Sequence, residues 1–118
     1  MIENRYKEVR MLLSENRIET AEKIYTELAD SAERFSKEDK FWFKLLTSEI
    51  KRKKENLQLA LDDIEDAFLL SKKIKLDNAQ KSSLHGRMAI IQYGLKNYAK
   101  AASFFRQTLS FLSDDLGR

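Results

Sequence analysis

The sequence predicts an all-α protein, and three observations support that prediction. The chain has 118 residues with three glycines and no proline, so few residues suit the tight turns that join β-strands. Leu, Lys, Glu and Ala are frequent, as in helical proteins. Apolar residues recur every three or four positions through most of the chain, which is the period of an amphipathic helix. The length fits one domain with a substantial core.

The first two helices are predicted from their apolar stripes and from the break between them. A first helix spans about residues 2–15, and Asn16 interrupts it. Asn16 and Glu19 have the spacing of a capping box, in which each side chain satisfies a free backbone donor of the other residue. We therefore expect the second helix to begin at Asn16 and to continue to about Phe35.

Four more helices follow from the same reasoning. The segment Ser36-Lys37-Glu38-Asp39 is typical of a helix start, and the basic run Lys51-Arg52-Lys53-Lys54 suits a helix end, where cations oppose the negative end of the helix dipole. We predict helices over about 36–54, 57–73, 78–95 and 97–112, and a frayed tail over 114–118.

The residue inventory excludes most catalytic chemistry. The chain has no cysteine and one histidine, His85, which removes thiolate zinc sites, cysteine nucleophiles and histidine-based metal clusters. The acidic residues of the fourth predicted helix are expected on a hydrated outer face, whereas acid–base catalysis requires a desolvated pair. These residues are Asp62, Asp63, Glu65 and Asp66. We predict a protein that is not an enzyme, with no catalytic residue, no metal and no cofactor.

Charge and hydropathy limit the partners and the location. No uncharged apolar run approaches the roughly 18 residues of a membrane span, and the charged start of the chain does not resemble a secretory signal. We therefore expect a cytoplasmic protein with no membrane partner.

The basic run 51–54, with Lys72, Lys73 and Lys75, is also compatible with nucleic-acid binding. That alternative is weaker, because the net charge is only +3, and dipole compensation together with pairing to Asp62, Asp63 and Asp66 already accounts for these lysines.

A pattern repeats along the chain with a period of about 40 residues. Breaks occur at Asn16, Asn56 and Asn97, and each precedes a helix whose early alanine lies 39 or 41 residues from its counterpart. Three tandem helix-turn-helix units, over about 1–35, 36–76 and 77–113, produce such a pattern. The alternative is a helical bundle in which these coincidences are accidental.

The third unit carries a resemblance to a known family. Met88-Ala89, Asn97-Tyr98, Ala101, Phe104-Phe105 and Leu109 look like the small and aromatic positions of a tetratricopeptide repeat (TPR). The resemblance, to a variant with long helices, implies a right-handed superhelical stack of three units and about six antiparallel helices. It also implies a protein-interaction role rather than catalysis.

In this family, the first helix of each unit lines a concave groove that binds peptides. By register, the resemblance implies a groove formed by Tyr6, Arg10, Leu13, Trp42, Leu45, Glu49, Arg52, Lys53, Arg87, Ile90 and Tyr93. Basic and aromatic residues predominate in this set, so the expected ligand is an acidic or amphipathic peptide or protein segment. The corresponding function is that of an adaptor, chaperone or regulatory sensor.

Aromatic residues suggest further contacts. Phe41, Trp42 and Phe43 span about 200° of a helix, so one packed side cannot bury all three rings, and at least one should face a neighbouring unit, a partner or a ligand. The final helix has no following unit to cover Phe104, Phe105, Phe111 and Leu112. The alternative function is therefore a self-associating structural module, or a fragment of a longer helical-repeat scaffold.

Overall fold

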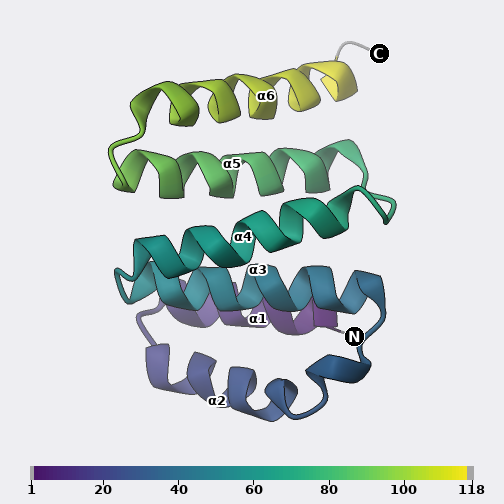
Figure 1. The fold of residues 1–118 in the computed structure, drawn as a ribbon, viewed down its shortest axis with the longest axis vertical. Helices are drawn as coiled ribbons and strands as arrows, with labels where there is room; N and C mark the ends of the chain where they lie inside the picture. The colour runs from purple at the N-terminus through teal and green to yellow at the C-terminus, as the bar shows by residue number, and fades with distance from the viewer. Residues whose placement is uncertain (1, 117–118) are drawn as a thin grey trace. The chain divides into compact units, whose positions relative to one another are not determined.

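The computed structural model describes the backbone of residues 2–116 and the side chains of residues 2–114. Within that range the chain is helical and contains no strand, which confirms the predicted all-α class (Figure 1). The elements are α1 (Ile2–Ser14), α2 (Ile18–Ala29), the 3-10 helix η1 (Ala32–Arg34), α3 (Lys37–Lys53), α4 (Leu57–Ser71), α5 (Asn78–Gly94) and α6 (Tyr98–Leu116).

The chain divides into two compact units, Met1–Ile74 and Lys75–Arg118. The first unit contains α1 to α4 with η1, and the second contains α5 and α6. Each unit is described by itself below.

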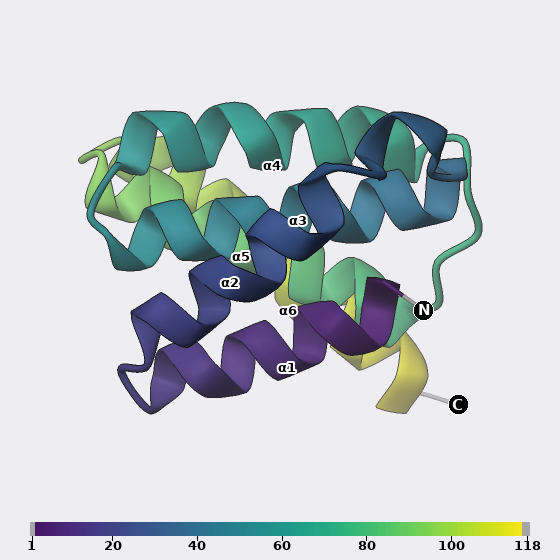
Figure 2. The same cartoon turned by 90° about the horizontal axis from the view of Figure 1, so that it is seen from below.

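Helix α3 is the centre of the first unit. It packs against α1, α2 and α4, and Figure 2 shows it between α4 and α1. All residues over 45–50 are consequently buried, although three of them are polar. Thr47 donates a hydrogen bond to the Lys44 carbonyl within its own helix, and Ser48 Oγ donates one to the Ala60 carbonyl of α4 at 2.8 Å. A buried hydroxyl group needs a hydrogen-bond partner, and these bonds provide one for Thr47 and for Ser48. Other helices can therefore pack against α3 on several sides.

The same turn joins α1 to α2, α3 to α4, and α5 to α6. Asn16, Glu55 and Lys96 adopt left-handed backbone conformations, with φ of 61°, 65° and 67°. In each turn the next N–H donates to a carbonyl five residues earlier, at 2.8 or 2.9 Å, which closes a Schellman motif. The 39- and 41-residue spacings in the sequence therefore correspond to a repeated local structure.

The alanine after each turn is buried because it lies on the side of its helix that packs against the preceding one. Ala21, Ala60 and Ala101 are each the fourth residue of their helices, and their exposed fractions are 0%, 0% and 2%. A larger side chain at these positions would separate the two helices of a hairpin.

The predicted capping box at Asn16 and Glu19 is wrong. The N-cap of α2 is Arg17, which makes no side-chain capping bond, and Asn16 is the left-handed residue that ends α1. Asparagine tolerates this conformation better than most residues, so it marks a helix end here rather than a helix start. The described residues do contain a capping box, at Asp77 and Gln80 at the start of α5.

Two predicted helix ends also require correction. The second helix ends at Ala29 rather than near Phe35, because Asp30 and Ser31 form a turn before the short η1. Helix α6 continues to Leu116 and includes part of the predicted tail, since no helix-breaking residue precedes Gly117. Residues 117–118 of the predicted tail lie outside the described residues.

Candidate functional site

The sequence-predicted groove residues of the first unit meet where α1 packs against α3. The Tyr6 and Trp42 ring centroids are 5.5 Å apart with a tilted geometry, and the Arg10 guanidinium carbon lies 5.8 Å from the Tyr6 centroid. Arg10 therefore lies over Tyr6, one ring of an aromatic pair contributed by two helices, in the arrangement of a cation–π contact. We call the surface formed by Arg10, Trp42, Arg52 and Lys53 the α1–α3 face.

A buried ion pair lies beneath this face. Arg52 contacts the Glu49 carboxylate at 3.1 Å, and their side chains are 30% and 6% exposed. The pairing compensates for the cost of burying the Glu49 charge and holds the guanidinium next to Tyr6. Arg52 is therefore already engaged, and its accessible part contributes positive charge to the surface.

Tyr6 is a buried phenol in a charged environment. Its side chain is 3% exposed, and no described residue forms a hydrogen bond with its hydroxyl group. Burial raises the pKa of Tyr6 well above its ordinary value, and the nearby Glu49 carboxylate raises this pKa further. The positive charges of Arg10 and Arg52 lower the pKa by a smaller amount, and Arg10 lies close enough to the hydroxyl to lower it further as a weak donor, although its geometry is not that of a regular hydrogen bond. The phenol is consequently neutral across the physiological pH range.

Exposure separates the predicted groove residues of the first unit into two groups. Arg10 is exposed, and Trp42, Arg52 and Lys53 are half-buried. The remaining four, Tyr6, Leu13, Leu45 and Glu49, are buried. The expectation that these four form a ligand-contacting surface therefore needs correction, because α1 packs directly on α3 and places them in the interior.

The predicted groove residues of the second unit all lie on α5. Arg87 is half-buried, whereas Ile90 and Tyr93 are 38% and 62% exposed. Tyr93 contacts Tyr98 of α6 edge to face, with ring centroids 5.3 Å apart. The second unit thus exposes an aromatic pair near the α5–α6 turn.

The aromatic triplet of α3 is divided among several neighbours. Phe41 is 1% exposed and belongs to the core, and Trp42 contacts Tyr6 of α1. Phe43 stacks on Tyr25 of α2 at 5.7 Å and meets Phe35 edge to face at 5.6 Å. The rings therefore face neighbouring elements of the same unit, and Trp42 and Phe43 stay only half-buried.

Carboxylates pair with three of the four cations in the basic run at the end of α3. Lys51 pairs with Asp63 at 2.7 Å, and Lys54 pairs with Glu22 at 3.0 Å. Asp63 is buried and also lies 3.9 Å from Lys44, so the expectation of a hydrated outer position is wrong for this residue. The predicted pairing of the basic run with Asp63 is confirmed for Lys51, whereas the burial of Asp63 was not predicted.

Sequence reasoning missed a surface pocket of about 200 Å³ between α2, α3 and α4. Its apolar lining includes Tyr25, Ile50 and Leu59, and the paired Glu22 and Lys54 also line it. The pocket depends on how three helices pack, so no local signal in the sequence identifies it.

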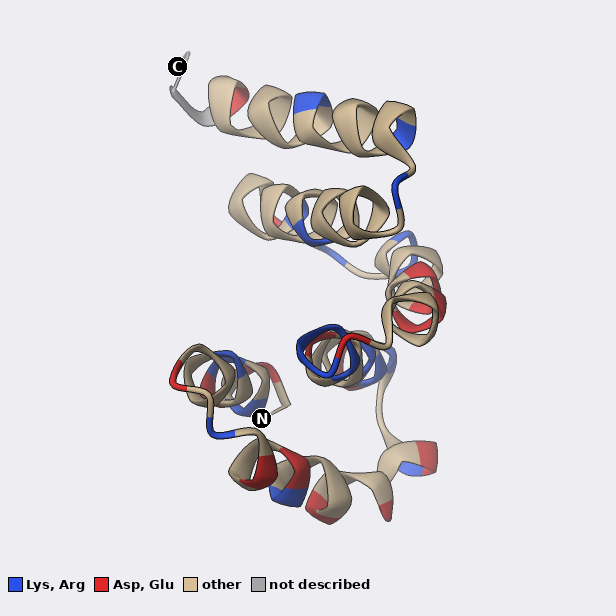
Figure 3. Ribbon diagram, turned by 90° about the vertical axis from the view of Figure 1, so that its left-hand side faces the viewer, with Lys and Arg blue, Asp and Glu red and all other residues tan. Residues whose placement is uncertain are grey.

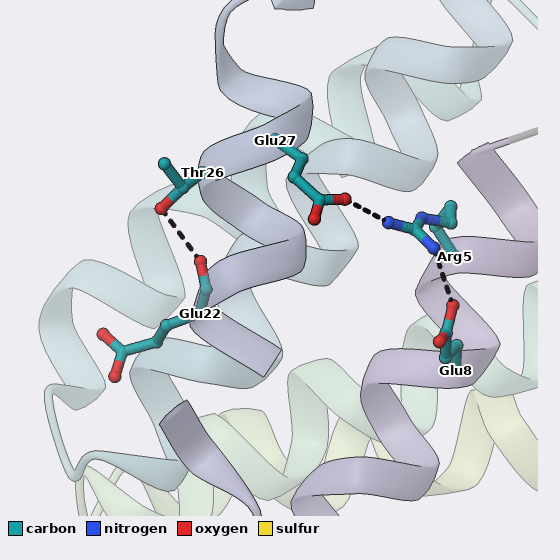
Figure 4. Close-up of polar contacts among 5 residues, drawn as sticks. All are labelled: Arg5, Glu8, Glu22, Thr26 and Glu27. Carbon is teal, nitrogen blue, oxygen red and sulfur yellow. Dashed lines mark hydrogen bonds and ion pairs between the residues drawn. The ribbon is translucent and has the colours of Figure 1, made fainter. Parts of the chain in front are cut away.

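One ion pair links α2 to α1 at the surface of this unit. Arg5 contacts Glu27 of α2 at 2.7 Å and Glu8 of its own helix at 3.1 Å (Figure 4). All three side chains are at least one-third exposed, so each pair adds only a few tenths of a kcal/mol to stability.

The four residues of the predicted self-association edge lie on two sides of α6. Phe104 and Phe111 point toward α5, where their ring centroids lie 6.0 and 4.9 Å from that of His85. Phe105 and Leu112 are each 42% exposed. The two faces of α6 are therefore distinct.

Comparisons with known proteins identify no relative. No protein-family model matches the sequence, and searches of curated proteins and of solved structures found no match either. Among the described residues, no helix is long and apolar enough to span a membrane, and no group of three acidic or histidine side chains has a metal-binding arrangement.

Proposed function

We propose that this chain is a non-enzymatic, TPR-like protein-interaction module whose α1–α3 face binds an acidic segment of a partner protein. The observation that carries the proposal is the placement of Arg10. Arg10 is an exposed residue whose guanidinium lies over the Tyr6 ring, which in turn contacts Trp42, and none of the described carboxylates lies within ion-pair distance of it. A cation positioned in this way favours an incoming anion.

Trp42 provides the apolar part of this recognition. The chain has one tryptophan, and it is half-buried between Tyr6 and Phe41. A fixed aromatic ring with an accessible edge binds an apolar side chain with little loss of conformational entropy, and tryptophan is enriched at the energetic centres of protein interfaces. Acidic groups near such a side chain would pair with Arg10 and with Lys53.

The chemistry of the buried groups supports binding rather than catalysis. Tyr6 is held neutral by burial, and Glu49 is engaged with Arg52. A general base needs an accessible group whose pKa lies near the working pH, and neither residue meets both conditions. The adaptor, chaperone and sensor roles differ only in the partner that is bound.

The proposal is tested by selecting peptides from a random display library on the immobilised chain. We expect the recovered peptides to contain an apolar residue flanked by Asp or Glu. Their affinity should fall about tenfold or more in the Arg10→Glu/Lys53→Glu variant, since two lost surface ion pairs contribute about 1.4 kcal/mol or more. Arg52 is left unchanged, because its loss would leave Glu49 buried without this partner.

A matched control carries the same change in charge elsewhere in the first unit. Arg17 and Arg34 are exposed and lie outside the α1–α3 face, so the Arg17→Glu/Arg34→Glu variant should bind the selected peptides like the wild type. Equal losses in both double variants would indicate a nonspecific charge effect and would contradict the proposal. Recovery of basic or purely apolar peptides would contradict it as well.

A further inference from the structure

Helix α6 carries two apolar stripes, and one of them packs against α5. Thr108 Oγ1 lies 3.4 Å from the Ser82 carbonyl and 3.7 Å from the position that a Cβ atom at Gly86 would occupy. Phe104 and Phe111, on the same side of α6, contact His85. With the buried Ala101, these residues form the internal contact of the second unit.

The second stripe is exposed. Tyr98, Phe105, Leu109 and Leu112 are 57%, 42%, 63% and 42% exposed, and Ala102 between them is exposed too. We call these five residues the α6 seam. Their spacings of four, three, four and three positions form the a/d pattern with which a helix packs against another helix.

The size of the α6 seam distinguishes it from scattered surface leucines. Its four large side chains present about 400 Å² of apolar surface, the size at which an exposed patch usually has a function. Charged side chains are sparse along α6 (Figure 3), and Lys100, Arg106 and Asp114 are the charged residues among its described side chains. The seam is therefore suited to a helix rather than to a highly charged ligand.

The charges of α6 point to an antiparallel second copy. The first turn has no acidic residue and the last turn no basic residue, whereas Lys100 lies near the positive N-terminal end and Asp114 near the negative C-terminal end. Both charges oppose the dipole of their own helix, which is unfavourable. An antiparallel α6 would bring each Lys100 toward the Asp114 end of the other copy and would align the two helix dipoles favourably.

The same orientation gives a consistent register. When two α6 helices cross near Gln107, Phe105 of each copy lies opposite Leu109 of the other, and Ala102 lies opposite Leu112. Small residues then face large ones, and the contact obeys two-fold symmetry.

We propose that the α6 seam is the surface on which a second copy of this chain docks in antiparallel orientation. Two seams together present about 800 Å² of apolar surface, which places the contact in the range of small, weak interfaces. We therefore expect a reversible dimer. The proposed dimer contact uses residues of the second unit only, whereas the proposed peptide site uses residues of the first unit.

Sedimentation equilibrium over 1 to about 500 µM tests the proposal. We expect a monomer–dimer equilibrium, and Leu109→Glu should raise its dissociation constant at least tenfold. The control is Leu69→Glu on α4, since Leu69 and Leu109 are both 63% exposed. Circular dichroism of both variants should match the wild type, because neither position is buried.

Two further variants test the orientation. Reversing one charge in Lys100→Glu should weaken the dimer. Reversing the charge that lies opposite it as well, with Asp114→Lys, should restore the dimer. The chain has no cysteine, so oxidation of a mixture of Phe105→Cys and Leu109→Cys should give a disulfide-linked heterodimer in higher yield than either variant alone.

A monomer at all concentrations, a dimer insensitive to Leu109→Glu, or a higher yield from either single variant would overturn the proposal. The Leu109→Glu variant should bind the selected peptides like the wild type. A failure of the dimer proposal can then be distinguished from a failure of the proposed function.

Discussion

Replacing Tyr6 with phenylalanine removes a single buried hydroxyl group and leaves the ring in place. The Tyr6 side chain is 3% exposed, and no described residue forms a hydrogen bond with its hydroxyl group. Burying a polar group without a hydrogen bond costs about 1–3 kcal/mol, so removing the group should not destabilise the protein. We expect Tyr6→Phe to increase the free energy of unfolding at pH 7 by about 1 kcal/mol.

The same variant should change how stability depends on alkaline pH. Burial raises the pKa of Tyr6 in the folded state above the value of about 10 in the unfolded chain. Above that pH the unfolded state releases the Tyr6 proton while the folded state retains it, so stability falls as pH rises. Relative to Tyr6→Phe, the wild type should lose about 1.4 kcal/mol between pH 8 and pH 11.

Urea unfolding at several pH values measures this difference, and Trp42 fluorescence provides a local signal because its ring contacts Tyr6. The matched control is Tyr93→Phe, whose ring is 62% exposed and lies in the second unit. This variant should leave the urea unfolding transition that Trp42 fluorescence reports unchanged. A loss of more than about 2 kcal/mol at pH 7 in Tyr6→Phe would mean that the hydroxyl is hydrogen-bonded, and a difference independent of pH would refute the raised pKa.

Two further predictions concern the first unit. Asp63→Asn should lower the free energy of unfolding by about 1–2 kcal/mol, because it removes a buried charge paired with Lys51, although the accessible lysine can regain water. Asp62→Asn, at an exposed position of the same helix, should change it by less than about 0.5 kcal/mol, and equal effects in urea unfolding would contradict the burial of Asp63. Glu55→Gly should raise the unfolding temperature, because Glu55 has a φ of 65° and glycine adopts this conformation without strain, a gain of about 0.5–1 kcal/mol. Glu55→Ala keeps the strain, so calorimetry should show no such increase, and an equal rise in both variants would rule out this explanation.

The local patterns of the sequence were sufficient to predict helices but not which helix covers which side chain. Helix α3 begins after Ser36 as predicted, since the Ser36 hydroxyl accepts the Asp39 N–H, an interaction within four residues of sequence. The burial of Asp63 depends on Lys51 of another helix, which the acidic pattern within α4 does not encode.

The two stripes of α6 show the same limit. Both have helical spacing and both contain phenylalanine, so periodicity alone does not distinguish Phe104, which faces α5, from Phe105, which is exposed. Tyr6 and Glu49 were expected in a groove from the register of the repeat resemblance. That register does not specify how closely α1 packs against α3, and this packing places both residues in the interior.

The central claim is that the α1–α3 face of the first unit binds an acidic protein segment, and the emission of Trp42 tests it most directly. Titration with an acidic peptide recovered by selection should produce a saturable change in Trp42 fluorescence. We predict a dissociation constant about tenfold higher in Arg10→Glu/Lys53→Glu and unchanged in Arg17→Glu/Arg34→Glu. Peptide binding that leaves Trp42 emission unaltered, or that is equally strong in both double variants, would contradict the claim.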